Sequence, residues 1–281
     1  MNHRKLYDKV CILMSEQMTK EYSTSFSLGI RMFEKSLRQP IYAIYGFVRL
    51  ADEIVDTFHE IDKAYYLKQI REETMSAISN RISLNPILHS FQETVHRYEI
   101  DSVYINAFLD SMEMDLDMTR FNFEEYKKYI YGSAEVVGLM CLKVFVKGDQ
   151  AKFEELKDKA QALGSAFQKI NFLRDIKSDF EERGRIYFPD LSDHHLTEVQ
   201  KSSIEQDILM DFKKGLEGIK LLPVGSRLGV YVAFRYYYRL YLKISTARAS
   251  ALLEKRFRIN NLHKLCLLFK TYIRYQLNLI R

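Results

Sequence analysis

Long stretches with helical spacing of apolar residues run almost without interruption through this chain. Only eleven glycines and four prolines occur in 281 residues. No stretch alternates apolar and polar residues between glycine-rich turns, as a half-buried strand would. The apolar share of 47% is ample for a core, and no Pro- or Ser-rich linker divides the chain. The sequence therefore predicts an all-α fold, with residues 1–281 forming a single helical domain.

The periodic segments give the expected helices by range: 3–21, 40–58, 61–79, 86 onward, 101–118, 123–147, 153–180, 198–221, 227–254 and 260–280. Pro40 and Pro86 would stand in first turns, where proline's missing N–H leaves no helix bond unmade. Four acids within the helix expected over 101–118 are expected to face solvent; they are Asp110, Glu113, Asp115 and Asp117. Asp193-His194-His195 predicts a solvated loop rather than a metal site.

Two of these helices each carry a pair of aspartates four residues apart. The pairs are Asp52 with Asp56 and Asp175 with Asp179. On a helix, residues i and i+4 lie on one face, about 6 Å apart along the axis. A lone pair of this kind is usually a solvated face. Here apolar residues flank both pairs, and buried carboxylates must be paired or bind a metal. Two such stripes facing each other would form an acidic basin suited to Mg²⁺.

Two other segments allow a structural and a functional interpretation. The hydroxyls of Ser23 and Ser25 fit a helix cap, or a phosphate held at a helix start. Gly132 and Gly138 lie in a helical context, where each glycine costs about 1 kcal/mol relative to alanine. They indicate either close helix contact or the wall of a channel for a long apolar substrate. The irregular segment 181–189 follows the second aspartate pair, where a lid could lie.

Basic charge is concentrated at the C-terminal end. Residues 235–281 hold eleven of the 42 basic residues and one of the 37 acidic ones, Glu254. Such a segment suits anionic lipid, nucleic acid, or diphosphates inside the protein; nucleic acid is least favoured, because no known binding module accompanies the charge. Three scattered cysteines, no apolar leader and no uninterrupted apolar span predict a cytoplasmic protein with reduced thiols.

Taken together, these motifs resemble the squalene and phytoene synthases, the head-to-head prenyl-diphosphate condensing enzymes. The similarity covers roughly residues 15–265. Its parts are Asp52–Asp56, Tyr129–Gly138, Asn171–Asp179 with Arg183 and the segment 185–189, the hydroxyls Ser23 and Ser25, and the pair Tyr238-Arg239. One position departs from the family pattern, since Glu135 stands where a glycine is usual. Either Glu135 points away from the channel, or the packing there differs.

The resemblance implies a helical bundle around one deep cavity with Mg²⁺ at its mouth, replaceable by Mn²⁺. The implied metal ligands are Asp52, Asp56, Asn171, Asp175 and Asp179. Tyr129 and Arg49 would join the aspartates in catalysis. The implied substrate-binding residues are Ser23, Ser25, Arg49, Gln168, Asn171, Arg174 and Tyr238. Arg49 and Arg174 would contact diphosphate or fix the orientation of the aspartates.

The resemblance also implies the reaction. We expect two geranylgeranyl diphosphates to condense through a cyclopropyl diphosphate to phytoene. The alternative is farnesyl diphosphate, giving dehydrosqualene, or squalene if NADPH is used. A non-catalytic scaffold is a second alternative, disfavoured because all four aspartates remain. We further expect peripheral contact with the inner membrane surface through Arg256, Arg258, Lys264 and Lys270, and no nucleic acid or obligate protein partner.

Overall fold

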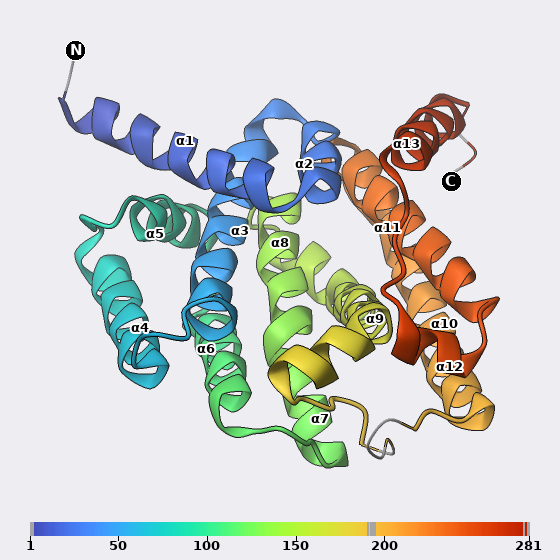
Figure 1. Ribbon diagram of the computed structural model, residues 1–281. Helices are drawn as coiled ribbons and strands as arrows, with labels where there is room; N and C mark the ends of the chain where they lie inside the picture. Colours follow the sequence, from blue (N-terminus) through green and yellow to red (C-terminus); the bar gives the residue numbers. More distant parts are fainter. Residues whose placement is uncertain (1–2, 190, 192–194, 278, 280–281) are drawn as a thin grey trace.

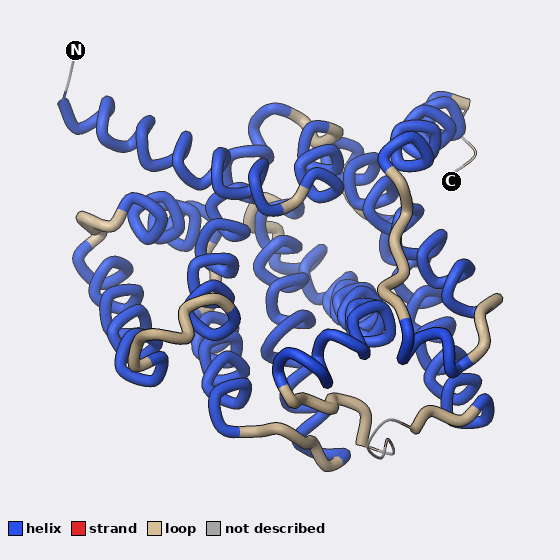
Figure 2. Tube along the Cα trace, in the orientation of Figure 1, coloured by secondary structure: helices blue, strands red, loops and turns tan. Residues whose placement is uncertain are grey.

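The computed structural model describes residues 3–189, 191, 195–277 and 279. Within these residues the secondary structure is helical, apart from single bridge residues that include the pair Arg120 and Ile186 (Figures 1 and 2). The prediction of an all-α fold is confirmed. The loop expected at Asp193 and His194 lies outside the described residues.

The N-terminal half contains α1 (His3–Tyr22), α2 (Thr24–Arg31), α3 (Lys35–Asp56), α4 (Lys63–Asn80), α5 (Pro86–Tyr98) and α6 (Ser102–Asp117). The C-terminal half contains α7 (Phe123–Ile130), a π-helical turn η1 (Tyr131–Glu135), α8 (Val136–Val146), α9 (Gln150–Arg183), α10 (Glu198–Leu221), α11 (Val224–Ser245), α12 (Ala249–Glu254) and α13 (Asn261–Gln276). The helices expected over 3–21, 61–79, 101–118 and 198–221 are confirmed to within two residues.

Helix α3 is central because it packs against α1, α5, α6 and α8 (Figure 1). Its Phe47 is fully buried and stacks on Phe91 of α5, with ring centroids 4.0 Å apart. The edge of Phe108 on α6 meets the same ring at 5.3 Å. Aromatic pairs in these geometries add about 0.5–1.5 kcal/mol to the free energy gained by burying their area. This core fixes the helix that carries the first aspartate pair.

The turn η1 is packed closely on both sides. A Cβ added to Gly132 would lie 2.4 Å from the carbonyl oxygen of Ala107 on α6. A Cβ added to Gly164 of α9 would lie 2.6 Å from the carbonyl oxygen of Ala134 in the turn. Close helix contact therefore accounts for Gly132. Among the described residues, Phe123–Val146 alone is long and apolar enough to cross a membrane, but 56% of its most apolar part is buried within the protein, so we assign it to the core.

Two helix boundaries differ from the prediction. Helix α3 begins at Lys35, so Pro40 lies inside it rather than in its first turn. The helix expected over 227–254 ends at Ser245 and resumes as α12. The Ser245 hydroxyl donates to the carbonyl of Leu242, and the Thr246 hydroxyl donates to that of Lys243. Hydroxyls that bond nearby carbonyls in this way compete with helix continuation.

Two side chains of α10 form hydrogen bonds with the backbone at the same break between α11 and α12. The Lys201 ammonium donates to the carbonyl oxygen of Ser245 at 3.3 Å. The Glu198 carboxylate accepts from the backbone N–H of Ala249 at 2.7 Å, which satisfies the start of α12. Because these partners come from a distant helix, the break was not visible in the local sequence.

Candidate active site

An apolar cavity of about 240 Å³ lies between α2, α3, α8, α9, α10 and α11. Most of its wall is aliphatic or aromatic, including Phe26, Val48, Phe145, Leu163, Ile219 and Val230. Gly138 is also part of the wall, as the channel interpretation expected, and Gln168 is among its few polar residues. The arrangement suits a long hydrocarbon group shielded from water.

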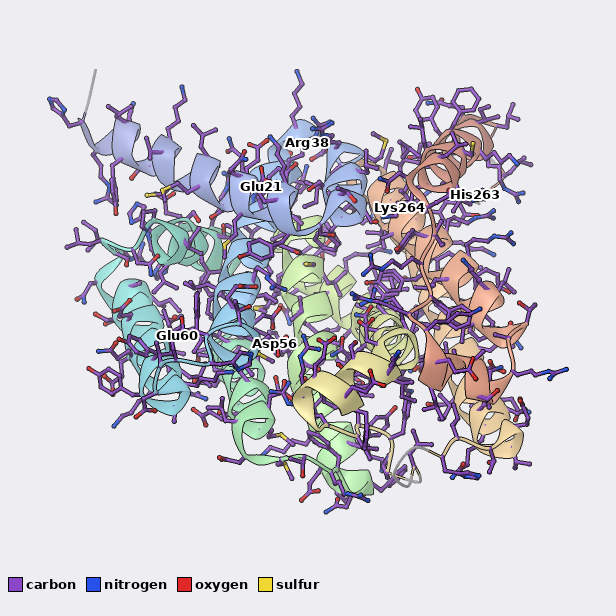
Figure 3. All side chains as sticks on the ribbon, viewed as in Figure 1. Glu21, Arg38, Asp56, Glu60, His263 and Lys264 are labelled. Carbon is purple, nitrogen blue, oxygen red and sulfur yellow. The ribbon has the colours of Figure 1, made fainter. Side chains whose placement is uncertain are left out.

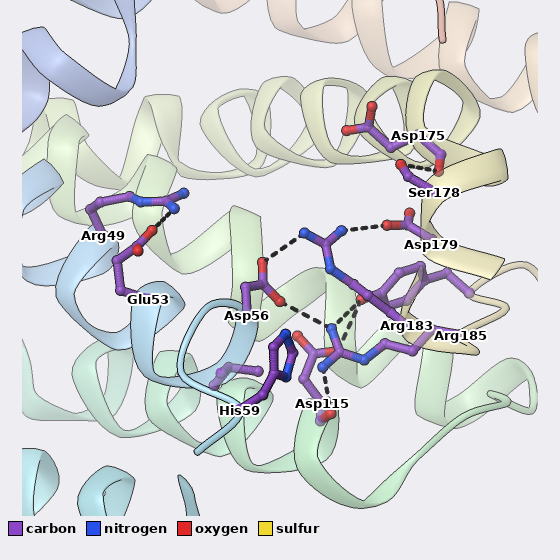
Figure 4. Close-up of polar contacts among 12 residues, drawn as sticks. Arg49, Glu53, Asp56, His59, Asp115, Asp175, Ser178, Asp179, Arg183 and Arg185 are labelled. Carbon is purple, nitrogen blue, oxygen red and sulfur yellow. Dashed lines mark hydrogen bonds and ion pairs between the residues drawn. The ribbon is translucent and has the colours of Figure 1, made fainter. Parts of the chain in front are cut away.

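The two aspartate pairs face each other across an arginine. Asp52 and Asp56 lie in the last turns of α3, and Asp175 and Asp179 lie in the C-terminal half of α9. Arg183 places Nη2 3.4 Å from Oδ2 of Asp56, and its Nη1 donates to Oδ1 of Asp179 at 2.7 Å (Figure 4). The structure thus brings the predicted stripes together, with a guanidinium between them.

The carboxylates at this site are poorly solvated. Burial raises the pKa of Asp52 to about 7, with Asp56 and Asp115 adding to the effect and Arg49 and Arg183 opposing it. Asp52 has no hydrogen bond or ion pair within the described part of the chain. Burial likewise raises the pKa of Asp179 to about 7, against the influence of Arg183. Neighbouring carboxylates that are shielded from water are stabilised when they bind a proton or a metal cation.

Asp175 is held by arginines on two sides. Arg174 donates to both of its oxygens, at 2.9 Å and 2.5 Å. Arg256, which follows α12, donates to the same two oxygens at 2.6 Å and 3.1 Å. Arg174 therefore orients an aspartate, one of the two roles expected for it. Arg256, which was expected to contact a membrane, forms this ion pair at the site.

Arg49 has other partners than the aspartates of its own helix. Its guanidinium pairs with Glu53, one turn along α3, and lies 4.3 Å from the ring centroid of Tyr22 (Figure 4). Its charge still lowers the pKa of Asp52. The structure thus places Arg49 beside the acidic site, with its ion pair made to Glu53.

Asp115 corrects the expectation that the acids of α6 face solvent. Its side chain is buried and accepts hydrogen bonds from Tyr129 at 2.6 Å and from Tyr187 at 3.0 Å. Arg185 donates to its backbone carbonyl at 2.8 Å and contacts Asp56 at 3.3 Å. Burial raises the pKa of Asp115 to about 6, while Arg185 and the hydrogen bond from Tyr129 oppose the shift.

Tyr129 is therefore part of a buried polar chain rather than of the cavity wall. Burial raises the pKa of its phenol well above the ordinary value, and the nearby Asp115 adds to this. Its ring packs against Phe121, Phe172 and Tyr187. The chain runs from Tyr129 through Asp115 and Arg185 to Asp56, and so reaches the aspartate stripes.

One amide oxygen near the stripes has no hydrogen-bond partner among the residues that the structure describes. Asn171 donates to Gln168 at 3.3 Å, whereas its Oδ1 is buried without a hydrogen bond. An unpaired buried acceptor costs free energy unless a ligand satisfies it. Carboxylate and amide oxygens are the ligands of a hard cation such as Mg²⁺. The residues present fit that ion, and Asp52, Asp56, Asn171, Asp175 and Asp179 would hold it.

A smaller pocket of about 110 Å³ is lined by basic and hydroxyl side chains. Ser23, Ser25, Arg174, Tyr237 and Lys264 are among its lining residues. Ser23 caps α2 by accepting from the backbone N–H of Phe26, which confirms the capping interpretation. Burial lowers the pKa of Lys264, with Arg258 and Arg174 adding to it. Among the described residues that line this pocket none is acidic, so it suits an anion such as a diphosphate.

Tyr238 lies outside the site that it was expected to line. Its ring packs on Phe212 and Phe234 and borders a groove between α11 and α13. The preceding residue takes its place, since Tyr237 stacks on Phe167 with centroids 4.0 Å apart. Adjacent residues point about 100° apart on a helix. Matching the family's C-terminal tyrosine one residue too late therefore assigns Tyr238 to the position that Tyr237 takes.

Glu135 is accommodated away from the apolar cavity. It accepts a hydrogen bond from Gln161 of α9 at 3.0 Å, and it is not among the cavity's lining residues. Burial raises the pKa of its carboxyl, and the bond from Gln161 opposes the shift. Of the two possibilities raised by the sequence, the first holds.

The fold and site thus define a class: helical proteins with a water-excluding cavity, facing carboxylate pairs at one end and a cationic pocket beside them. A model of the squalene/phytoene synthase family matches residues 19–263. The chain belongs to this family.

Similar proteins agree with this assignment. The phytoene synthase of Arthrospira platensis is 32% identical over 199 residues, covering 66% of this chain and 64% of that protein. Phytoene synthase 1 of Zea mays is 29% identical over 243 residues, covering 79% and 58%. The 4,4'-diapophytoene synthase of Staphylococcus haemolyticus is 26% identical over 201 residues, covering 69% and 68%. The chain thus spans less than two thirds of the first two relatives.

Solved structures share the fold. A dehydrosqualene synthase in complex with a ligand superposes with a TM-score of 0.82, at 21% identity, over 97% of this chain and 98% of that one. Squalene synthase HpnC from Alicyclobacillus acidocaldarius gives 0.71, at 20% identity, over 89% and 94%. At these identities the likeness concerns the fold alone.

Proposed function

We propose that this protein joins two prenyl diphosphates head to head and that its substrate is geranylgeranyl diphosphate, giving phytoene. One observation carries the proposal: two aspartate pairs and a cationic pocket lie beside an apolar cavity. An anionic head and a long hydrocarbon tail need these two environments side by side. The phytoene synthases among its relatives support the choice of substrate.

The chain's own residues have distinct tasks in this reaction. Arg174, Lys264 and the serines of the small pocket bind diphosphate oxygens. Mg²⁺, when bound by the aspartates and Asn171, supplies a Lewis acid for the departing diphosphate. The apolar wall keeps water from the allylic cation, which would otherwise be quenched to an alcohol. The double bond of the second substrate then attacks that cation.

Proton loss closes the cyclopropyl ring of the intermediate. Tyr129 and Asp115 are buried groups joined by a 2.6 Å hydrogen bond and connected through Arg185 to Asp56. We assign Tyr129 to positioning the diphosphate or the proton in this half of the reaction. The cyclopropyl diphosphate then loses its own diphosphate in a second ionisation. We assign Gln168 to this step, because it lines the cavity and accepts a hydrogen bond from Asn171.

The test is incubation of purified protein and Mg²⁺ with geranylgeranyl or farnesyl diphosphate, with and without NADPH, followed by mass spectrometry of the hydrocarbon. We expect phytoene from geranylgeranyl diphosphate without NADPH. Dehydrosqualene or squalene from farnesyl diphosphate would keep the chemistry and replace the substrate. If neither diphosphate is consumed, the enzyme proposal fails and a scaffold role gains support.

A matched pair of variants on α9 sharpens the test. Asp179→Asn removes a buried carboxylate of the site, and Asp158→Asn changes an aspartate whose side chain is 76% exposed on the same helix. Loss of a metal ligand should lower product formation at least about a hundredfold, because metal stabilisation of the leaving group contributes several kcal/mol. The Asp158 variant should keep wild-type activity. Equal activity in both variants would contradict the assignment of Asp179.

A further inference from the structure

Helix α13 carries its apolar face outward. Leu262, Leu265, Phe269, Tyr272 and Ile273 are spaced three, four, three and one residues apart, so they share one face. Their exposed fractions are 70%, 58%, 66%, 45% and 40%. The opposite side, which packs toward α11, contains Leu267 and Tyr275, which pack against the core, and the fully buried Thr271, whose hydroxyl has no hydrogen-bond partner among the described residues. Helix α13 therefore has apolar side chains on two sides, and those of the stripe lie in water although apolar residues of this size are usually buried.

A basic groove of about 1010 Å³ runs along the side of this stripe, between α11 and α13. Its cations are Arg235, Arg239, Lys243, Arg258 and Lys270, and no acidic residue lines it in the part of the chain that the structure describes. Figure 3 labels Lys264 on the side of α13 toward α2 and α11 and His263 on the other side. The basic charge of the C-terminal segment is therefore divided: Arg256 and Lys264 lie at the site, and these five cations line the groove on one side of the exposed stripe.

A second exposed stripe lies on α1. It consists of Leu6, Val10, Leu13 and Met14, which are 41%, 41%, 50% and 46% exposed. Figure 1 shows α1 and α13 along the same end of the molecule. Apolar patches of this kind on monomeric proteins mark contact with a protein or a membrane.

We infer that α13 docks the protein on an anionic lipid bilayer, its apolar stripe entering the interface and the groove cations contacting headgroups. This combination of an apolar face and a basic flank is that of an interfacial helix. A second copy fits less well, since a symmetric contact through α13 would bring two acid-free basic grooves together. The inference does not rest on the proposed reaction.

The chain supplies its own reporter for the test. Cys266 is exposed on α13, whereas Cys11 is buried and Cys141 is half-buried. Burial raises the pKa of the Cys141 thiol to about 12, which keeps it unreactive at neutral pH. An environment-sensitive fluorophore on Cys266 therefore reports on α13. The labelled full chain is mixed with vesicles of phosphatidylcholine, alone or with phosphatidylglycerol.

We expect binding and a blue-shifted emission with the anionic vesicles and much weaker binding to phosphatidylcholine alone. Leu265→Glu with Phe269→Glu should weaken binding at least about tenfold, because two apolar side chains no longer leave water. The matched control, Leu84→Glu with Val199→Glu, changes residues that are 90% and 80% exposed elsewhere and should bind like the wild type. Lys270→Gln with Arg274→Gln should weaken binding roughly fivefold per charge.

Three results would overturn the inference. The first is unchanged binding by the stripe variant while circular dichroism shows its helices intact. The second is equal wild-type binding to both vesicle types, which would remove the electrostatic part. The third is a wild-type dimer that Phe269→Glu dissociates, together with no vesicle binding, which would assign the stripe to a second copy.

Discussion

Arg185 places its Nη1 3.3 Å from Oδ1 of Asp56, a residue 129 positions earlier in the chain. Arg183, two residues before it, contacts the other oxygen of the same carboxylate. The end of α9 and the segment that follows it are therefore tied to α3 through one aspartate. A single substitution of Asp56 would remove both of these contacts, while the hydrogen bonds from Arg185 and Tyr187 to Asp115 would remain.

Asp56→Asn should open the segment 184–189. Both arginines lose one ionic partner, while Arg183 keeps Asp179 and Arg185 keeps Asp115. Partly exposed ion pairs are worth about 0.2–1 kcal/mol each. We expect trypsin to cleave after Arg183 or Arg185 several times faster than in the wild type, because proteolysis follows the population of the open form. Asp158→Asn is the control, and equal cleavage rates in the two variants would contradict the tether.

Arg183→Gln should make the protein depend on divalent cations. Without the guanidinium, Asp56 and Asp179 face each other with no cation between them, and like charges destabilise the fold. We expect the melting temperature to fall by about 2–4 °C, the shift that 1 kcal/mol produces in a large domain. Mg²⁺ should raise it more in the variant than in the wild type. A Mg²⁺ effect no larger than in the wild type would argue against a cation site there.

Asp115 should make stability depend on pH. Burial raises its pKa to about 6, whereas an unfolded aspartate titrates near 3.9. The folded state then holds the proton more tightly, so this contribution is complete below about pH 4 and is lost as pH rises through about 6. The difference corresponds to about 2–3 kcal/mol in the free energy of unfolding.

Asp115→Asn isolates this contribution. The variant keeps a side chain of the same shape that does not titrate, while Asp52 and Asp179 remain in both proteins. Between pH 4 and 7, urea denaturation should show the wild type losing stability relative to the variant. Parallel stability curves over that range would mean that Asp115 is not buried as an acid.

Gly132→Ala should destabilise the contact between η1 and α6. The added methyl group would lie 2.4 Å from the carbonyl oxygen of Ala107 and 2.6 Å from Cβ of Ser111. Overpacking of this kind costs about 1–3 kcal/mol. Gly29→Ala is the control, because its methyl group would meet only the carbonyl oxygen of Gly229 at 3.6 Å. Urea midpoints measure both, and an unchanged midpoint for Gly132→Ala would show that α6 moves aside freely.

The sequence predicted the helical elements and an aspartate stripe on each of two helices because both follow from local spacing. Asp52, Asp56, Asp175 and Asp179 each stand at a position that helix periodicity defines. The end of α11 at Ser245 escaped prediction, since the local sequence has no glycine or proline there and the partners of the break come from α10.

The contacts of Asp115 and Arg256 were not predicted for the same reason, since their partners lie far away in the sequence. Asp115 is one of several acids on α6, and only Tyr129 and Tyr187, far along the chain, make it a buried residue. Arg256 belongs to a basic segment, and nothing near it in sequence indicates that it would reach Asp175. A stripe can be deduced from one helix, whereas a hydrogen-bonded network requires knowing which helices meet.

The π-helical turn Tyr131–Glu135 restricts which sequence changes this protein can tolerate during evolution. Such a turn inserts an extra residue into a helix, so the side chains beyond it are rotated in phase relative to those before it. Tyr129 can therefore keep its angle toward Asp115 while Val137, Gly138 and Cys141 aim at the cavity. Deleting one residue from this turn would restore a regular α-helix and rotate either Tyr129 away from Asp115 or the cavity-lining residues away from the cavity. A substitution before the turn, in contrast, leaves the orientation of the side chains after it unchanged.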